Sequence, residues 1–165
     1  FSCFRLIPSA AGTHMFVPVH GMAEFGTNQA QEVNNGTGTD PNTSVDKGAT
    51  TDDTVNMLFN VPFNMTIDAV KVFASTDQDT DCTLNYHVMS YDMVADGTTN
   101  DGNLSNGTVL ADGQATSVDR NVLKSIDMTI QSSNVTSDKV IACFVENETN
   151  TDDINIQVQV KYHIA

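Results

Sequence analysis

The chain has 165 residues, a length that suits one compact domain with a sizeable core. Its 21 Asp and Glu residues outnumber seven Lys and Arg, and the formal net charge is −14. A surface this negative repels nucleic-acid phosphates and anionic lipids, so we expect neither a nucleic-acid partner nor a membrane partner. No apolar run reaches the length that a transmembrane helix needs.

The kind of acidic residue points to β-structure. Seventeen of the 21 acids are Asp, which favours turns and caps, and only four are Glu, which favours helices. The three cysteines cannot all pair within one chain, and their spacing matches no zinc site and no CxxC pair. We expect Cys82 and Cys143 to be buried free thiols in a chain made in a reducing compartment.

Residues 1–25 are apolar but are interrupted by Pro8 and Pro18, so a long helix is not expected. Two interpretations stay open: an extended arm, or a first strand over residues 13–19 paired inside the domain. The start, FSCFRLIPSAAG, has too short an apolar core for a signal peptide, so we do not expect export.

Residues 26–54 have a different composition. They are dense in Gly, Asn, Thr and Asp and hold almost no large apolar side chains. Such a segment cannot bury enough surface to offset its ordering entropy, so it is either mobile or ordered by contact with something else. We therefore divide the chain into an N-terminal arm with a long polar loop, residues 1–54, and a folded domain, residues 55–165.

The segment 57–74, MLFNVPFNMTIDAVKVFA, alternates between apolar and polar residues, as a strand with one wet face does. The alternation slips by one residue at Asp68, which predicts a β-bulge or a sharp bend there. Pro62 lacks the N–H that a β-ladder needs, so we place it at an edge or an irregularity.

Further strands follow at short intervals. Alternation predicts strands over residues 82–93, 122–130 and 154–164, with His87 on the face opposite Leu84, Tyr86 and Val88. The apolar run 140–145 predicts a central strand, and Asp112-Gly113 predicts a hairpin turn. The pattern as a whole predicts an all-β fold: an antiparallel two-sheet sandwich, jelly-roll-like, with an extended N-terminal arm.

One acidic cluster could bind a metal. Asp77, Asp79 and Asp81 alternate like the start of a calcium loop, but position six is Cys82 instead of Gly and position twelve is Val88 instead of Glu. They are weak calcium candidates, and a solvated acidic turn explains them better.

No catalytic motif is visible. The four histidines, His14, His20, His87 and His163, are scattered, and neither a nucleophile elbow nor a glycine-rich phosphate loop is present. We expect a non-enzymatic protein with no catalytic residues and no cofactor.

The style of residues 55–165 resembles that of tailed-phage virion structural proteins, in particular capsid cement or decoration proteins with a jelly-roll-like sandwich. The resemblance lies in strands such as MLFNVPFNMTIDAVKVFA and NIQVQVKYHIA joined by turns rich in Asn, Asp and Thr. It implies a homotrimer that seats on the major capsid protein at the outer capsid surface, after assembly in the host cytoplasm, and that stabilises the capsid. Residues 1–54 would make the contact, and the expected partner-binding residues are Phe1, Phe4, Leu6, Ile7, Met15, Phe16 and Val17.

A second hypothesis is a trimeric tail- or head-fibre module that recognises a glycan or protein on the host surface. Residues 1–54 would then attach to a shaft, and the turns 75–81 and 95–106 would contact the receptor.

Overall fold

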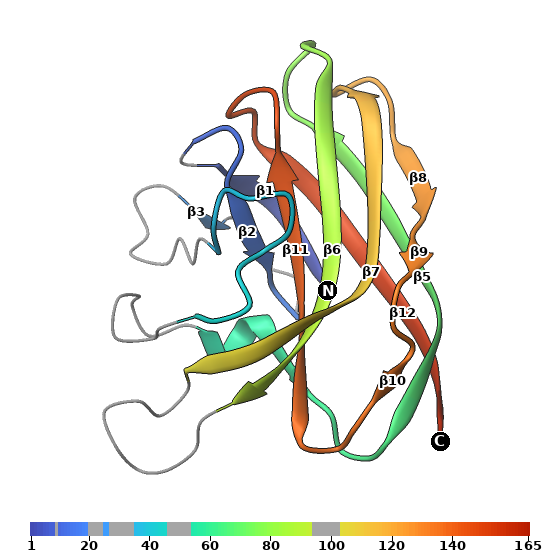
Figure 1. Ribbon diagram of the computed structural model, residues 1–165. Helices are drawn as coiled ribbons and strands as arrows, with labels where there is room; N and C mark the ends of the chain where they lie inside the picture. Colours follow the sequence, from blue (N-terminus) through green and yellow to red (C-terminus); the bar gives the residue numbers. More distant parts are fainter. Residues whose placement is uncertain (9, 20–24, 27–34, 46–53, 94–102) are drawn as a thin grey trace.

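Two stacked β-sheets form the domain (Figure 1). The structure, a computed structural model, describes residues 1–8, 10–19, 25–26, 35–45, 54–93 and 103–165. Sheet A contains β1 (Ser2–Ile7), β3 (Phe25–Gly26), β5 (Met65–Thr76), β8 (Lys124–Asp127), β10 (Asn134–Val135) and β12 (Ile154–Ile164). Sheet B contains β2 (His14–Val17), β4 (Leu58–Asn60), β6 (Cys82–Met93), β7 (Leu104–Val118), β9 (Thr129–Ile130) and β11 (Lys139–Asn147).

The strand order is β10-β5-β12-β1-β3 in sheet A, with β8 also paired to β5, and β2-β11-β6-β7-β9 in sheet B, with β4 also paired to β11. All pairs are antiparallel except β1 with β3. The predicted all-β, two-sheet antiparallel sandwich is confirmed. A 3-10 turn, η2 (Thr54–Met57), leads into β4, and no helix in the described ranges is long and apolar enough to cross a membrane.

The core lies between the two sheets and also under residues 35–45, which cover part of sheet B. The inward residues of β6, Leu84, Tyr86 and Val88, are fully buried, as their alternation predicts. Residues 140–147 of β11 are all buried, which confirms the predicted central strand. Cys82 and Cys143 are buried free thiols, as expected.

The bulge predicted at Asp68 is present. Ala69 pairs with Lys161 and Ile67 pairs with Tyr162, so Asp68 is the extra residue between two consecutive pairs of β5 and β12. Pro62 lies in the link between β4 and β5, where the chain passes from sheet B to sheet A. The stretch 57–74 therefore contributes a strand to each sheet.

Two predicted elements differ from the structure. Asp112-Gly113 is not a hairpin turn but lies in the middle of β7. The residues before and after it pair with the same strand, β6. The predicted strand 122–130 is divided at Met128 into β8, in sheet A, and β9, in sheet B. Long-range pairing decides both cases, which local turn preference cannot do.

Of the two open interpretations of residues 1–25, the paired strand describes the N-terminal segment. β1 pairs with β12 and β2 pairs with β11, so both are strands of the sandwich, and Figure 1 shows them in blue at one side of it. The alternative of a paired first strand describes this region, with bounds 14–17. Of the polar segment 26–54, residues 35–45 pack on sheet B, where Val45 forms a bridge with Leu104. The described parts of residues 1–54 are thus built into the domain.

Candidate functional site

The expected partner-binding residues differ in how far their side chains are exposed. Leu6, Met15, Phe16 and Val17 are at most 3% exposed, and Phe1 and Ile7 are partly buried. Phe4 alone in this set is strongly exposed, at 64%. The physical reason is strand pairing: β1 and β2 are built into the two sheets, which covers most of these side chains, while Phe4 is left exposed on β1.

Phe4 lines an apolar groove of about 570 Å³ on the outer face of sheet A. Ser2, Gln157 and Phe73 stand in register across β1, β12 and β5 and form its floor. Leu123, 69% exposed, also lines the groove and comes just before β8 in the chain. We call this region the sheet A groove.

The calcium candidates lie in the turn before β6. Asp77 accepts hydrogen bonds from the Asp153 N–H at 3.0 Å and from Gln78 Nε2 at 3.1 Å. Asp79 pairs with Arg120 Nη2 at 2.5 Å and accepts from Asn121 Nδ2 at 2.7 Å. Within the ranges that the structure describes, no three His, Cys, Asp or Glu side chains are grouped as metal ligands. The calcium site stays a prediction.

The most developed polar site lies on the outer face of sheet B. Antiparallel register places one residue from each of four adjacent strands in a row: His14, Glu146, Asn85 and Gln114. Cross-strand neighbours on one face lie close enough to interact. A second row, two residues further along, holds Phe16, Phe144, His87, Asp112 and Thr129.

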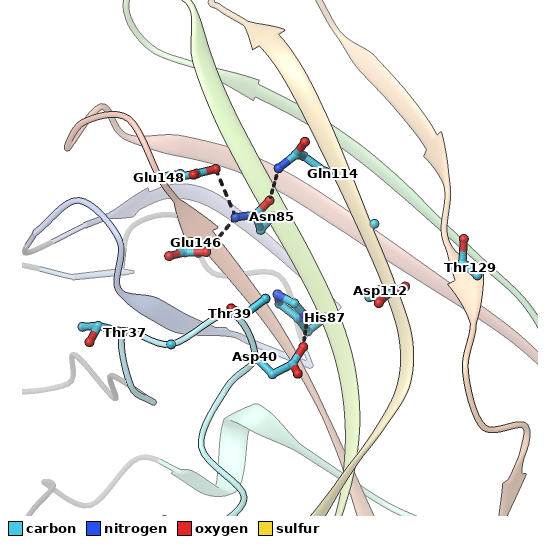
Figure 2. Close-up of a pocket in the computed structure, with 12 residues that line it drawn as sticks. Thr37, Thr39, Asp40, Asn85, His87, Asp112, Gln114, Thr129, Glu146 and Glu148 are labelled. Atoms are coloured by element: carbon cyan, nitrogen blue, oxygen red, sulfur yellow. Dashed lines mark hydrogen bonds and ion pairs between the residues drawn. The ribbon is translucent and has the colours of Figure 1, made fainter.

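Residues 37–40 cross above these rows and close a concave pocket of about 570 Å³, which we call the sheet B pocket (Figure 2). Its polar lining includes Asp40 from the crossing segment and Asp112, Glu146 and Glu148 from the sheet. Among the described residues that line it, none is a Lys or an Arg. Four carboxylates in one lining make the pocket negative.

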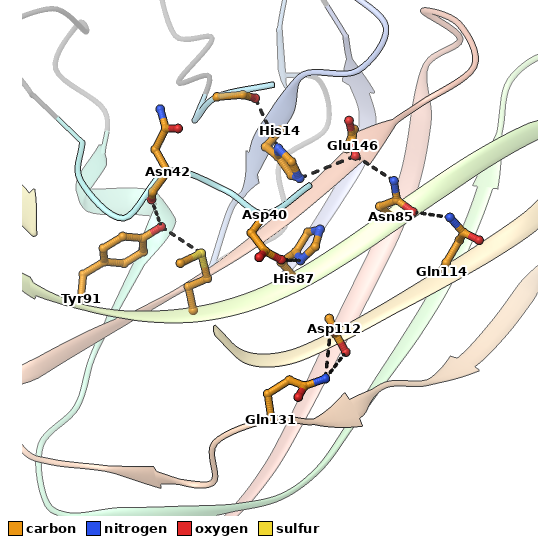
Figure 3. Close-up of polar contacts among 12 residues, drawn as sticks. His14, Asp40, Asn42, Asn85, His87, Tyr91, Asp112, Gln114, Gln131 and Glu146 are labelled. Carbon is orange, nitrogen blue, oxygen red and sulfur yellow. Dashed lines mark hydrogen bonds and ion pairs between the residues drawn. The ribbon is translucent and has the colours of Figure 1, made fainter. Parts of the chain in front are cut away.

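The first row is linked by hydrogen bonds (Figure 3). Gln114 Nε2 donates to Asn85 Oδ1 at 2.8 Å, and Asn85 Nδ2 donates to Glu146 Oε2 at 2.8 Å. Asn85 Nδ2 also donates to Glu148 Oε2 at 3.5 Å. Each amide therefore orients the next side chain, and two carboxylates converge on one nitrogen.

Two buried histidines contact each other here, His14 in the first row and His87 in the second. The rings of His14 and His87 meet edge to face, with centroids 4.9 Å apart. His14 Nδ1 lies 3.3 Å from the Gly36 carbonyl oxygen, and because a carbonyl only accepts, this nitrogen carries the hydrogen of that contact. His14 Nε2 lies 3.6 Å from Glu146 Oε2.

His87 makes no comparable hydrogen bond with the described residues. It is 6% exposed, and neither ring nitrogen has a hydrogen-bond partner among the described residues. Its Nδ1 lies 3.8 Å from Asp40 Oδ1, beyond hydrogen-bond distance. Burial, with a smaller effect from His14, lowers the pKa of His87 to about 4, against the opposing effect of Asp40 and Asp112. His87 is therefore neutral at pH 7.

The lining of the sheet B pocket comes from residues that lie far apart in the sequence. The alternation predicted the outward direction of His87, but it gave no sign that His14, Glu146, Asn85 and Gln114 share a row. That relationship depends on pairing between strands that are far apart in sequence.

These features define an acidic all-β sandwich with an apolar groove on one sheet and a carboxylate-rich pocket on the other. No protein-family model matches the chain, and no curated protein matches it significantly.

Proposed function

We propose that this chain is a non-enzymatic structural protein that decorates and stabilises a phage capsid, and that it attaches to the shell through the sheet A groove. The groove carries the attachment part of the proposal, and the resemblance of residues 55–165 to capsid decoration proteins supports the choice of partner. The homotrimer is part of the same proposal.

The exposure of Phe4 and Leu123 is the observation that favours a docking surface. Both are large apolar side chains, 64% and 69% exposed, on one groove. Burying such a side chain contributes about 1.5–3 kcal/mol, which a partner surface can recover. Asn155 and Gln159, which also line the groove, supply polar groups around these side chains.

Capsid binding is tested by adding the purified full chain to shells that lack it and measuring occupancy by co-sedimentation. The double variant Phe4→Ser, Leu123→Ser is expected to lower occupancy at least tenfold. Ile164→Ser is the matched control, because Ile164 is also 64% exposed but does not line the groove, and it should bind like the parent protein.

Equal occupancy of the double variant and the parent protein would overturn attachment through this groove. Adsorption of the parent protein to host cells, without binding to shells, would replace the proposal with the fibre hypothesis. Light scattering should give a mass about three times 17.8 kDa for a trimer, and a monomer mass would remove the trimer.

A further inference from the structure

The sheet B pocket lies on the other sheet from the groove, and its chemistry is different. Its carboxylates form two pairs. Glu146 and Glu148 converge on Asn85 Nδ2, at 2.8 and 3.5 Å. Glu146 is 6% exposed and is held in place by this amide, so its charge is fixed inside the pocket wall.

The second pair flanks His87. Asp40 Oδ1 lies 3.8 Å from His87 Nδ1, and Asp112 stands in register with His87 on the neighbouring strand. Gln131 Nε2 donates to both oxygens of Asp112, at 3.0 and 3.1 Å, which fixes the direction of that carboxylate.

His87 has unused hydrogen-bonding capacity at the wall of the pocket. A neutral imidazole has one N–H donor and one acceptor, and a side chain this well buried ordinarily has partners for both. Among the described residues neither ring nitrogen has a hydrogen-bond partner, and the side chain lines the pocket. A bound molecule with hydrogen-bond donors would satisfy the acceptor nitrogen and the carboxylates together.

The charge of the pocket and the distance between its two carboxylate pairs indicate which class of ligand fits. The four carboxylates, with no Lys or Arg among the described lining residues, favour a cation over a neutral polyol. The two pairs are organised by Asn85 and His87, which are two residues apart on β6 and so about 7 Å apart along the strand. Two ammonium groups joined by four carbons are separated by roughly 6 Å when extended.

We propose that the sheet B pocket binds a small aliphatic diamine, with one ammonium group between Glu146 and Glu148 and the other between Asp40 and Asp112, beside His87. Charge-assisted hydrogen bonds from each ammonium to its carboxylates supply the affinity. This site is independent of the proposed capsid attachment, because the two surfaces lie on different sheets.

The probe is butane-1,4-diamine, titrated into the full-length protein at pH 7 and low salt by calorimetry. We expect it to bind at least tenfold more tightly than butylamine, which has one charge, and than ethane-1,2-diamine, which is too short. Butane-1,4-diol tests the neutral alternative and should not bind measurably. Equal affinity for the diol and the diamine would overturn the cation assignment, and an absence of diamine binding would overturn the site.

Two variants each remove one charge from one pair with little change of shape. Glu148→Gln and Asp40→Asn alter exposed side chains, so the fold is retained, and each should weaken diamine binding roughly three- to tenfold. Asp127→Asn is the control: it also removes one negative charge, but on sheet A, outside the pocket, where the side chain is 81% exposed. If all three variants bind the diamine alike, the affinity comes from the general negative charge, and the proposed site is wrong.

Discussion

The amide of Asn35 donates a hydrogen bond to the hydroxyl of Tyr91 at 2.9 Å, and this contact fastens a covering segment to sheet B. The Tyr91 hydroxyl in turn donates to the Asn42 carbonyl at 2.9 Å. Asn35 and Tyr91 are both almost fully buried, at 2% and 0% exposure. The segment 35–45, which forms one wall of the sheet B pocket, is therefore held by a buried polar link.

Tyr91→Phe should destabilise the protein by about 1–3 kcal/mol, because the buried Asn35 amide loses the hydroxyl to which it donates at 2.9 Å. Urea denaturation measures the loss, and hydrogen exchange should show faster opening in residues 35–45. Unchanged exchange in that segment would show that the link does not hold it.

Tyr86→Phe is the matched control. Tyr86 is also buried, but its hydroxyl has no hydrogen-bond partner among the described residues. Removing an unsatisfied buried hydroxyl should leave stability unchanged or raise it by up to about 1 kcal/mol. A loss as large as that of Tyr91→Phe would contradict the difference between the two sites.

Gly107 allows the close approach of the same segment. A Cβ at this position would lie 2.5 Å from Tyr91 Cε1 and 2.8 Å from Thr43 Cα, and the Gly107 N–H donates to the Thr43 carbonyl at 2.8 Å. Gly107→Ala should therefore cost about 1–3 kcal/mol in thermal or urea unfolding.

Gly113→Ala provides the comparison, because its Cβ would meet Met128 Cγ at 3.3 Å and a flexible Met side chain can move. Its cost should stay below about 1 kcal/mol. The prediction is wrong if the two alanine variants are equally stable.

The stability of the protein should depend on pH through His87. Its pKa is about 4 in the folded state and about 6.5 when unfolded, so between these values the unfolded state binds more protons. The free energy of unfolding therefore falls as pH decreases from 6.5 towards 4, by about 3 kcal/mol at most. His14 lowers the pKa of His87 further, and Asp40 and Asp112 oppose this effect.

His87→Gln removes this contribution. Urea denaturation at pH 7.5, 6 and 5 should show a smaller decrease in stability for the variant than for the parent protein. Parallel curves over this range would mean that His87 does not titrate abnormally.

The N-terminal strands should contribute to the core. Phe16 is fully buried, and its ring centroid lies 4.3 Å from that of Phe144, so Phe16→Ala should cost about 3–5 kcal/mol. Phe4→Ala, at an exposed position of the same region, should change stability by less than about 0.5 kcal/mol. A mild effect of Phe16→Ala in urea would support a free arm instead.

Local alternation was enough to predict several elements. The strands over residues 82–93 and 154–164 have the bounds of β6 and β12, and the slip at Asp68 is a bulge. Side chains of a strand alternate between its two faces, so the direction of Leu84, Tyr86 and His87 is encoded in their own segment.

The sequence by itself determined the all-β class, the acidic surface and the faces of the regular strands, because each depends on composition or on neighbouring residues. Tertiary structure alone decided that β1 and β2 complete the sheets, that β7 continues through Asp112-Gly113, and that His14, Glu146, Asn85 and Gln114 form one row. Each of these depends on the register between strands far apart in the chain, and such register is fixed by the packing of the whole sandwich instead of by local preference.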